Sequence, residues 1–574
     1  MVFDQQMDQQ GEQSNDNLEK LGYFRVKLDQ AISMTGYGRF HYCLVLACGL
    51  CFLSAGFQNA LNAYILPSAR CDLELSSGQM GAVNVSFICG SILSAFLWGA
   101  LADCVGRKNV IATTLAADAI ITLICSLSQT FSLLAVFRFL NGFLSGAPAS
   151  LIFAYLGEFH THQNSNKNIC YVGFFWTLAW MLLPGLAWLV IPQSWSYQVP
   201  GFTYNSWRIF VAMLAVPSTL GALILLCFPE SPKYLLAVGK HQEALLVLSK
   251  MYTANTGNPP CEYSVKSLEI QGADNVNFPI ADNNQMMHKK SILILWKTMW
   301  AQTSAIFLPP VLYNTALCSL LLFANMFGYY GLGLWLPEIF NRFEDYYKLH
   351  PSETVSVCEL QQISSNINET IKYFPEIQNL TFENFDIKMN SSIAIQSSLT
   401  SKETSNQTVI STVATDGAIC DGDEVNTRVF FNTLIIGAAC LVGNILSGLL
   451  AGRVGVRVMP VCTMLLAGSC VFAIYFLRSS TQNLIVSCLF LSSIGTGNFV
   501  ITSVVVDLFP TKIRAMAVCT SILAGRVGAM TSNIVFGELI DVDCSVPIFL
   551  MGTVCIVGGI LGFFIPTKSV NKVS

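Results

Sequence analysis

Long apolar stretches separated by shorter polar segments dominate the pattern of the chain. A membrane-crossing helix needs about 20 mainly apolar residues, and twelve stretches come close to that length or exceed it. The pattern predicts an all-α membrane protein with two six-helix halves joined by a polar segment. The expected spans are Phe40–Leu66, Gly81–Ala102, Val110–Leu127, Phe131–Leu156, Ile169–Ile191, Phe210–Phe228, Val311–Leu336, Phe430–Gly452, Val458–Leu477, Leu484–Phe509, Ala515–Ile540 and Val546–Ile565.

Composition and charge support a lipid environment. Only 11% of the 574 residues are charged, 53% are hydrophobic, and the mean hydropathy is +0.53. A soluble protein carries roughly 25% charged residues, so the bilayer is an expected partner. The net charge of -4 excludes the basic surface of a nucleic-acid binder.

Basic residues in short loops set the expected orientation of the helices. Arg107 and Lys108 follow the second span, and Lys512 and Arg514 follow the tenth. Short loops rich in Lys and Arg remain in the cytosol, so both termini are expected there. The chain then divides into a cytosolic tail (residues 1–39), a first half (40–228), a cytosolic linker (229–310) and a second half (311–574).

Two stretches of the linker differ from the rest of it. Lys240–Tyr252 has the apolar spacing of a helix, and Lys289–Trp300 is expected to lie along the inner membrane surface. Both stretches are interpreted as spacers.

The long polar segment at residues 341–428 is expected on the extracytosolic side. It contains four N-x-S/T glycosylation acceptors, which agree with that placement: Asn368, Asn379, Asn390 and Asn406. A loop of this size is also a possible binding site for a protein partner.

Cysteines are numerous but show no metal-ligand spacing, so no metal site is expected. Most of the 20 lie inside apolar stretches and are interpreted as small packing residues. Cys358 and Cys420 fall in the extracytosolic loop, and we expect a disulfide between them. Cys71 is an alternative partner.

A gate motif lies between the second and third spans. The segment Gly99-Ala-Leu-Ala-Asp103-Cys-Val-Gly106-Arg107-Lys108 resembles the signature of the major facilitator family, so its twelve-helix fold is expected here. Gly99 would let a neighbouring helix approach closely, and Asp103 can accept from backbone amides or face a helix terminus. In that family the motif latches the cytosolic gate, and Gly99, Asp103, Gly106 and Arg107 are therefore assigned to gating.

Further motifs add to the expected gate. Residues 229–235 (Pro-Glu-Ser-Pro-Lys-Tyr-Leu) and 507–514 (Asp-Leu-Phe-Pro-Thr-Lys-Ile-Arg) resemble charge motifs of sugar and organic-ion porters. A weaker copy of the gate motif at residues 448–457 has Gly452 at the acidic position. The resemblance assigns gating roles to Glu158, Glu230, Asp507 and Arg514.

Within this family the chain resembles the synaptic vesicle glycoprotein 2 group. The matching segments are residues 31–40, 175–176, 195–198, 206–208, 329–332 and 443–445. The resemblance implies that Trp176, Tyr329 and Tyr330 line a solute cavity. The acidic residues that relatives carry in the first and tenth spans are absent, and Gln58, Asn498 and Thr502 are the polar residues at those sites. Proton coupling by the family's usual route is therefore not expected.

Charged residues inside spans are costly and usually face a cavity or a partner. Arg526 in the eleventh span resembles a cationic cavity position of relatives, although a structural pair with an acidic side chain is the alternative. Asp118 and Arg138 are interpreted as structural, with each other as possible partners. A neutral-polar cavity with one cation favours a neutral or anionic solute.

Two functions remain open at this point. The first is an alternating-access transporter of a small organic solute, gated by residues 99–108. The second is a non-transporting membrane glycoprotein that acts in trafficking or as a receptor. No enzyme constellation and no cofactor motif is found, and the resemblance indicates a vesicle membrane or the plasma membrane.

Overall fold

A computed structural model describes residues 25–269, 304, 306–309, 311–349, 427–454, 458–509, 511–540 and 542–566. Among these residues twelve helices are long and apolar enough to cross a membrane. The predicted number of spans is therefore confirmed. The helices are α3 (Arg39–Asp72), α4 (Ser77–Val105), α5 (Arg107–Cys125), α6 (Phe131–Gly157), α7 (His162–Val190), α8 (Ser206–Met213) with α9 (Ala215–Leu226), α13 (Leu312–Leu349), α16 (Thr427–Val454), α17 (Val458–Phe476), α18 (Ser480–Leu508), α19 (Thr511–Leu539) and α20 (Ser545–Leu561).

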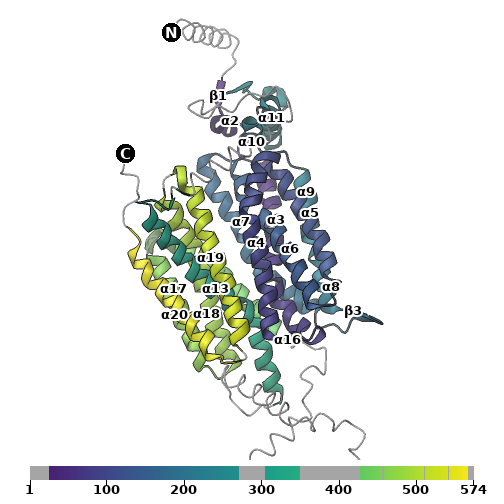
Figure 1. The fold of residues 1–574 in the computed structure, drawn as a ribbon. Helices are drawn as coiled ribbons and strands as arrows, with labels where there is room; N and C mark the ends of the chain where they lie inside the picture. The colour runs from purple at the N-terminus through teal and green to yellow at the C-terminus, as the bar shows by residue number, and fades with distance from the viewer. Residues whose placement is uncertain are drawn as a thin grey trace, which may run out of the picture.

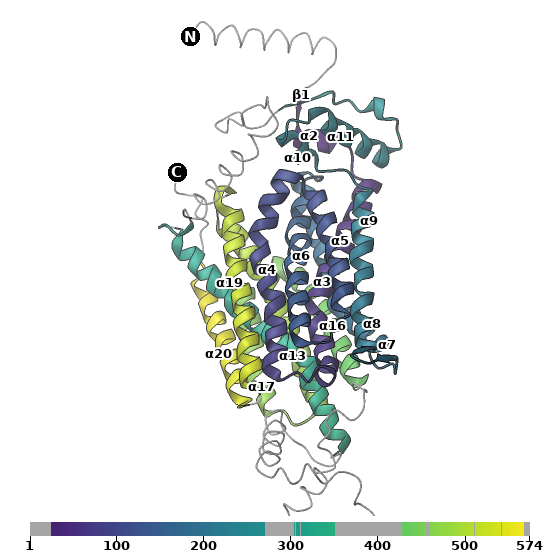
Figure 2. The ribbon, with the colours of Figure 1, turned by 45° about the vertical axis from the view of Figure 1, so that its right-hand side comes forward.

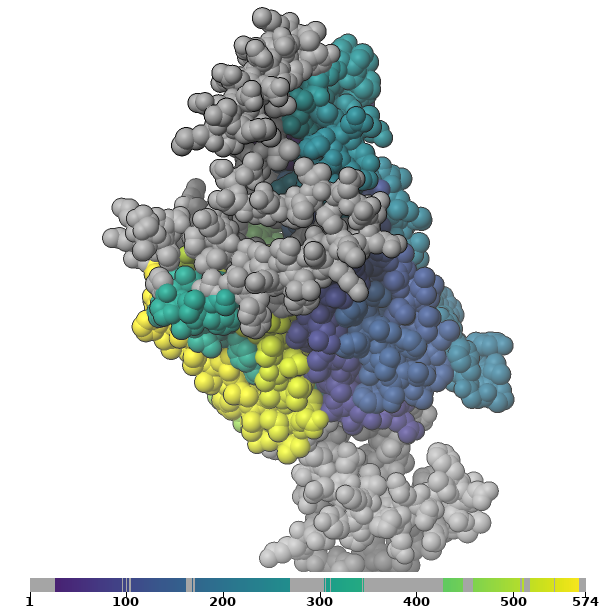
Figure 3. All heavy atoms as spheres, turned by 45° about the horizontal axis from the view of Figure 1, so that its top comes forward, coloured from purple at the N-terminus to yellow at the C-terminus, as the bar shows by residue number. Residues whose placement is uncertain are grey.

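The helices form two halves that stand side by side (Figure 1). The N-terminal half contains α3 to α9, and the C-terminal half contains α13 to α20. The halves meet where α4 packs against α19 and α7 against α16. In the space-filling view the purple and blue atoms of the N-terminal half lie beside the yellow and teal atoms of the C-terminal half (Figure 3).

The two ends of the bundle differ. At one end, called the linker end, lie the short helices α10 (Pro232–Ala237) and α11 (His241–Thr256) (Figures 1 and 2). At the opposite end, called the loop end, α3 finishes and α4 begins. The predicted helix at residues 240–252 is confirmed as α11, whereas residues 289–300 lie outside the described residues.

The segment before the first span is more ordered than a simple tail. Strand β1 (Arg25–Lys27) pairs in parallel with β4 (Ser267–Glu269) of the linker, and α2 (Leu28–Met34) follows directly. Buried Val26 and Ala31 share an apolar cluster with Val247 of α11. The single-turn helix η1 (Pro260–Glu262) completes this small unit.

Several helix bounds differ from the predicted ones. α13 runs to Leu349, so the polar segment expected from residue 341 begins later. The sixth span is divided at Leu214 into α8 and α9. Pro217 explains the break, because it has no N–H to donate and its ring would clash with the carbonyl four residues earlier. At the carboxyl end α20 finishes in a single turn, η3 (Gly562–Phe564).

Candidate functional site

A cavity lies between the two halves. Its free volume is about 40 Å3, well below the range of about 300–1,000 Å3 found for small-molecule sites, so the cavity is narrow in this state. Helices α3 and α7 supply one wall, and α13, α16 and α18 supply the other. None of the side chains that line the cavity is charged.

Aromatic side chains form much of the cavity wall. Trp176 and Trp180 come from α7, and Tyr329 comes from α13. The rings of Trp180 and Tyr329 meet edge to face with centroids 5.5 Å apart, and Phe52 packs behind Trp176 at 5.1 Å. Nε1 of Trp180 is buried without a hydrogen-bond partner among the described residues.

Polar side chains in the cavity are neutral. Asn498 and Asn444 both line it, and Asn444 Nδ2 donates to Thr177 Oγ1 across the two halves at 3.0 Å. The structure therefore brings together Trp176, Tyr329 and Asn498 of the predicted set. Trp180 and Asn444 were not assigned from sequence, although Trp180 lies one turn after Trp176 and so on the same helix face.

Gln58 does not line the cavity. It is 1% exposed and bridges two buried charges, since its Oε1 accepts from Arg138 at 2.8 Å and its Nε2 donates to Asp118 at 3.2 Å. Arg138 also donates to Asn62 at 2.7 Å. The polar side chain of Gln58 thus links Arg138 to Asp118 within the N-terminal half in this state.

Asp118 and Arg138 have the structural role expected of them, but Gln58 stands between them. Asp118 also accepts from Asn141 at 2.8 Å and from Ser218 at 2.9 Å. Each buried charge therefore has several hydrogen bonds, which offset the loss of water around it.

Arg526, Tyr330 and Thr502 lie outside the cavity wall. The Arg526 guanidinium donates to Ser91 of α4, and no described carboxylate lies within ion-pair distance of it. Tyr330 packs edge to face on Tyr329, with ring centroids 5.0 Å apart. The Thr502 hydroxyl donates to the backbone carbonyl of Asn498 at 2.8 Å.

Ion pairs join the two halves at the loop end. Glu338 of α13 accepts from Arg70 of α3 at 2.7 Å and from Arg342 at 2.8 Å. Arg342 also donates to Ser77 of α4 at 3.1 Å. Glu338 is only 4% exposed, so its charge interacts strongly with both guanidinium groups.

Small residues bring the helix backbones together at the same end. A Cβ added at Gly81 of α4 would lie 2.8 Å from the carbonyl oxygen of Asn533 and 3.1 Å from Cα of Gly537, both in α19. A Cβ at Gly437 would meet the backbone of Trp180 and Met181 at 2.9 Å. The halves are therefore closely sealed at the loop end.

The described ion pair and hydrogen bond of the gate motif at the linker end lie within the N-terminal half. Arg107 forms an ion pair with Glu158, and the Lys108 N–H donates to Glu230 at 3.1 Å. Gly106 has φ +106°, a conformation that favours glycine, and a Cβ there would also press on the Glu230 carboxylate. The structure brings together Gly106, Arg107, Glu158 and Glu230 of the predicted gate.

Gly99 has open space around it. A Cβ at this position would meet no atom within 4 Å, so the expected close approach of a neighbouring helix does not occur in this state. Among the described side chains, hydrogen bonds between the halves lie at the loop end or near the middle of the bundle. The side chains of Asp103, Asp507 and Arg514 lie outside the described part.

Two buried histidines meet at the linker end of the N-terminal half. The rings of His41 and His160 lie 4.9 Å apart. His160 Nδ1 donates to the carbonyl of Leu156 at 2.8 Å, and Nε2 has no partner among the described residues. Burial lowers the pKa of His160 to about 4, so the ring is neutral near pH 7.

Two cysteines at the loop end are disulfide-bonded. Cys71, considered as an alternative from the sequence, and Cys544 each take part in a disulfide bond. The expected pair Cys358 and Cys420 lies outside the described residues. The same holds for the glycosylation acceptors Asn368, Asn379, Asn390 and Asn406.

Comparison with known proteins identifies similar chains. A family model described as Major Facilitator Superfamily matches residues 48–351, more than half of the chain. Synaptic vesicle glycoprotein 2B of Homo sapiens is 26% identical over 579 residues, covering 92% of this chain and 84% of that protein. Synaptic vesicle glycoprotein 2A of Rattus norvegicus is 28% identical over 333 residues, covering 56% of this chain and 45% of that protein. The resemblance to this group is confirmed.

A solved structure shows the same fold. It is the partially occluded, inward-open conformation of the xylose transporter XylE from E. coli. The TM-score is 0.57 at 13% sequence identity, and the match covers 93% of this chain and 99% of that chain. Both the sequence model and the structural match point to a multi-pass membrane protein.

Proposed function

The chain belongs to the Major Facilitator Superfamily, and we propose that it carries a small uncharged polar solute across the membrane by alternating access. The observation that carries the proposal is the cavity between the halves, with its aromatic wall and neutral polar groups. Such a wall suits a compact molecule with hydroxyl or carbonyl groups and an apolar face.

The free N–H of Trp180 favours a solute that carries a hydrogen-bond acceptor. A buried donor without a partner costs free energy, and a solute acceptor would satisfy it. Asn444 and Asn498 offer both donors and acceptors on the opposite wall. A neutral molecule with several hydrogen-bonding groups is therefore favoured over an ion.

An anionic solute is the weaker alternative in this state. Arg526 is the cation expected to attract it, but its guanidinium is bonded to Ser91 and lies outside the cavity wall. An anion would reach Arg526 only after the halves rearrange.

The gates at the two ends support alternating access. The loop end is sealed by the Glu338 ion pairs and by the Gly81–Gly537 contact, whereas the described hydrogen bonds of the gate motif remain within one half. A carrier must close one end while the other is open. We assign Asp103, Asp507 and Arg514 to the linker-end gate as well.

Orientation follows from two features. Disulfides persist in oxidising compartments, and Cys71 and Cys544 lie at the loop end. Arg107 and Lys108 lie at the linker end, as the positive-inside rule requires of a cytosolic face. We therefore propose that the linker end and both termini are cytosolic, with residues 229–310 as the linker and a glycosylated loop outside. The named relatives favour a vesicle membrane.

Uptake into proteoliposomes tests the proposal. The purified chain would be offered a pool of neutral polyols, amides and organic anions, and accumulated solutes would be read by mass spectrometry. Trp180→Phe removes the free N–H together with the five-membered ring that carries it, and the matched control is Trp188→Phe, which makes the same change at an exposed Trp of the same helix. We expect uptake of a neutral solute that falls in Trp180→Phe and is retained in Trp188→Phe.

Absence of uptake of every solute by folded protein would overturn the proposal. The chain would then act as a membrane glycoprotein on a transporter scaffold, through a protein partner at the loop of residues 341–428. Uptake of anions alone would instead indicate that the solute binds at Arg526.

A further inference from the structure

A β-hairpin joins α7 to α8 at the loop end. Strands β2 (Ser196–Val199) and β3 (Phe202–Asn205) pair antiparallel, with Tyr197 opposite Tyr204 and Val199 opposite Phe202. Pro200 and Gly201 make the turn. Gly201 has φ +80°, the conformation that the third residue of a type II turn requires.

The register divides the hairpin into two unlike faces. Side chains alternate between the faces of a strand, so one face carries Tyr197, Val199, Phe202 and Tyr204. The other face carries the uncharged polar residues Ser196, Gln198, Thr203 and Asn205. The hairpin is therefore amphipathic, and residues 192–205 contain no charged side chain.

The β2 part of the apolar face is not covered by the rest of the chain that the structure describes, whereas Phe202 and Tyr204 of β3 are half-buried. Tyr197 is 66% exposed and Val199 is 45% exposed, and Trp195 just before β2 is 53% exposed. An isolated two-stranded hairpin is marginally stable in water. Such a face requires a partner to remain ordered.

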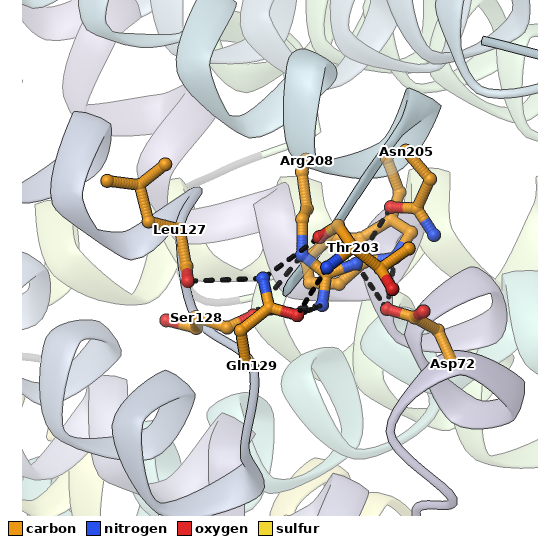
Figure 4. A network of polar contacts seen from close by, with 8 residues as sticks. Asp72, Leu127, Ser128, Gln129, Thr203, Asn205 and Arg208 are labelled. Atoms are coloured by element: carbon orange, nitrogen blue, oxygen red, sulfur yellow. Dashed lines mark hydrogen bonds and ion pairs between the residues drawn. The ribbon is translucent and has the colours of Figure 1, made fainter. Parts of the chain in front are cut away.

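The base of the hairpin is held rigidly by a buried polar network (Figure 4). Arg208 of α8 forms an ion pair with Asp72 of α3 and donates to the carbonyl of Ser128 at 3.0 Å. Gln129 holds the hairpin itself, because its side chain donates to the Thr203 carbonyl at 2.9 Å and accepts from the Thr203 N–H at 3.1 Å. The network fixes the direction in which the hairpin projects.

The hairpin projects sideways from the loop end of the N-terminal half (Figures 1 and 2). The Tyr204 hydroxyl lies 3.3 Å from Ser126 Oγ, just beyond the end of α5. The neighbouring surface presents Leu123 of α5 and Leu127 of the turn that follows it, each 49% exposed, as expected of a surface that contacts lipid. The apolar face of the hairpin thus continues the lipid-facing surface of the bundle.

We propose that this apolar face lies in the boundary between headgroups and acyl chains of the leaflet at the loop end. Tyr and Trp concentrate at this depth, since their rings are apolar and their N–H or O–H remains hydrated. The absence of charge and the continuity with α5 favour lipid over a protein partner. The hairpin is then a membrane-interface anchor of the N-terminal half, fixed by Arg208 and Gln129.

Lipid photolabelling tests the anchor. The full chain would be placed in phosphatidylcholine nanodiscs that contain a lipid with a diazirine near its glycerol group, and labelled peptides would be mapped by mass spectrometry. We expect strong labelling of the peptide that contains residues 192–207, and background labelling of α11 at the linker end.

Two matched variants separate the two faces of the hairpin. Val199→Glu places a carboxylate on the apolar face and should lower lipid labelling of the hairpin by roughly threefold or more, because an ionised group leaves the apolar boundary. Gln198→Glu places the same charge on the polar face and should leave the labelling unchanged. Unchanged labelling of an α17 peptide shows that each variant is folded.

Three results would overturn the proposal. Wild-type hairpin labelled no more than α11 would mean that the face is in water and serves a protein partner instead. Full labelling of Val199→Glu, or an equal loss in both variants, would show that the apolar face does not make the lipid contact.

Discussion

The loop end and the linker end of the bundle differ in which described bonds they contain. At the loop end the buried carboxylate of Glu338 connects Arg70 and Arg342, and α4 and α19 touch at Gly81 and Gly537. At the linker end the described hydrogen bonds and ion pairs of Arg107 and Lys108 bind partners in the same half.

The difference separates two tasks. Bonds within the N-terminal half hold that half together in every state, whereas bonds between halves must break and form again during transport. Contacts between the halves at the loop end can act as a pivot about which the two halves move.

The largest expected effect comes from filling the glycine contact. Gly81→Leu places a side chain against the backbone of α19, and overpacking of this kind costs about 1–3 kcal/mol. We expect a lower melting temperature and a fall in uptake of roughly tenfold or more. Gly99→Leu at the linker end is the control, because open space surrounds that position, and its melting temperature should remain near that of the wild type. Equal melting temperatures for Gly81→Leu and Gly99→Leu would mean that the helices are packed no more closely at Gly81 than at Gly99.

Removal of the Glu338 charge should open the loop end. In Glu338→Gln, Arg70 and Arg342 lose their shared carboxylate, and because Arg70 is partly exposed we expect a cost of about 1–3 kcal/mol rather than the full cost of a buried pair. Faster hydrogen exchange at the loop end of α3 would show the opening. Glu262→Gln on the exposed turn η1 serves as the charge control. Unchanged exchange in Glu338→Gln would mean that the glycine contact alone closes this end.

Acid should weaken the linker end. The folded protein holds His160 with a pKa of about 4, below the value of 6.5 in the unfolded chain. Between these values the unfolded chain binds a proton that the folded protein does not, so stability falls as the pH falls. The loss should reach roughly 2 kcal/mol at pH 5. Melting temperatures from pH 7.5 to 4.5 would show a smaller decline in His160→Asn than in the wild type. Identical pH profiles would show that His160 titrates normally.

The smallest effect is expected at the surface of the linker. Lys240 and Glu243 of α11 form an ion pair at 2.9 Å, but both side chains are more than half exposed. A double-mutant cycle with Lys240→Gln and Glu243→Gln should give a coupling of about 0.5 kcal/mol or less. A coupling above about 1 kcal/mol would mean that the linker end depends on this pair more than the structure indicates.

Hydropathy predicts the twelve helices well but not their ends. α3 continues to Asp72 and α13 to Leu349, and these extensions contain Arg70, Glu338 and Arg342, which lower the apolar average. Their charges pair between helices far apart in sequence. The pairing of β1 with β4, 242 residues apart between Arg25 and Ser267, depends on long-range contacts that a local pattern does not contain.

The cavity was only partly predictable for a related reason. Trp176, Tyr329 and Asn498 were assigned by resemblance and do line it. Gln58 was assigned because relatives carry an acidic residue in the first span, and Arg526 because a charge in a span is costly and resembles a cationic cavity position. Neither argument tells whether a side chain faces a cavity or a neighbouring helix. Gln58 faces Arg138 and Asp118, and Arg526 faces Ser91.

Locking the loop end tests the central claim most directly. The double variant Arg70→Cys with Glu338→Cys would be cross-linked with a short reversible bifunctional thiol reagent in proteoliposomes, beside wild type and each single variant. Alternating access predicts that solute uptake stops on cross-linking of the double variant alone and returns when the bridge is cleaved. Full uptake with the bridge in place would contradict the account, because the loop end would then not need to open.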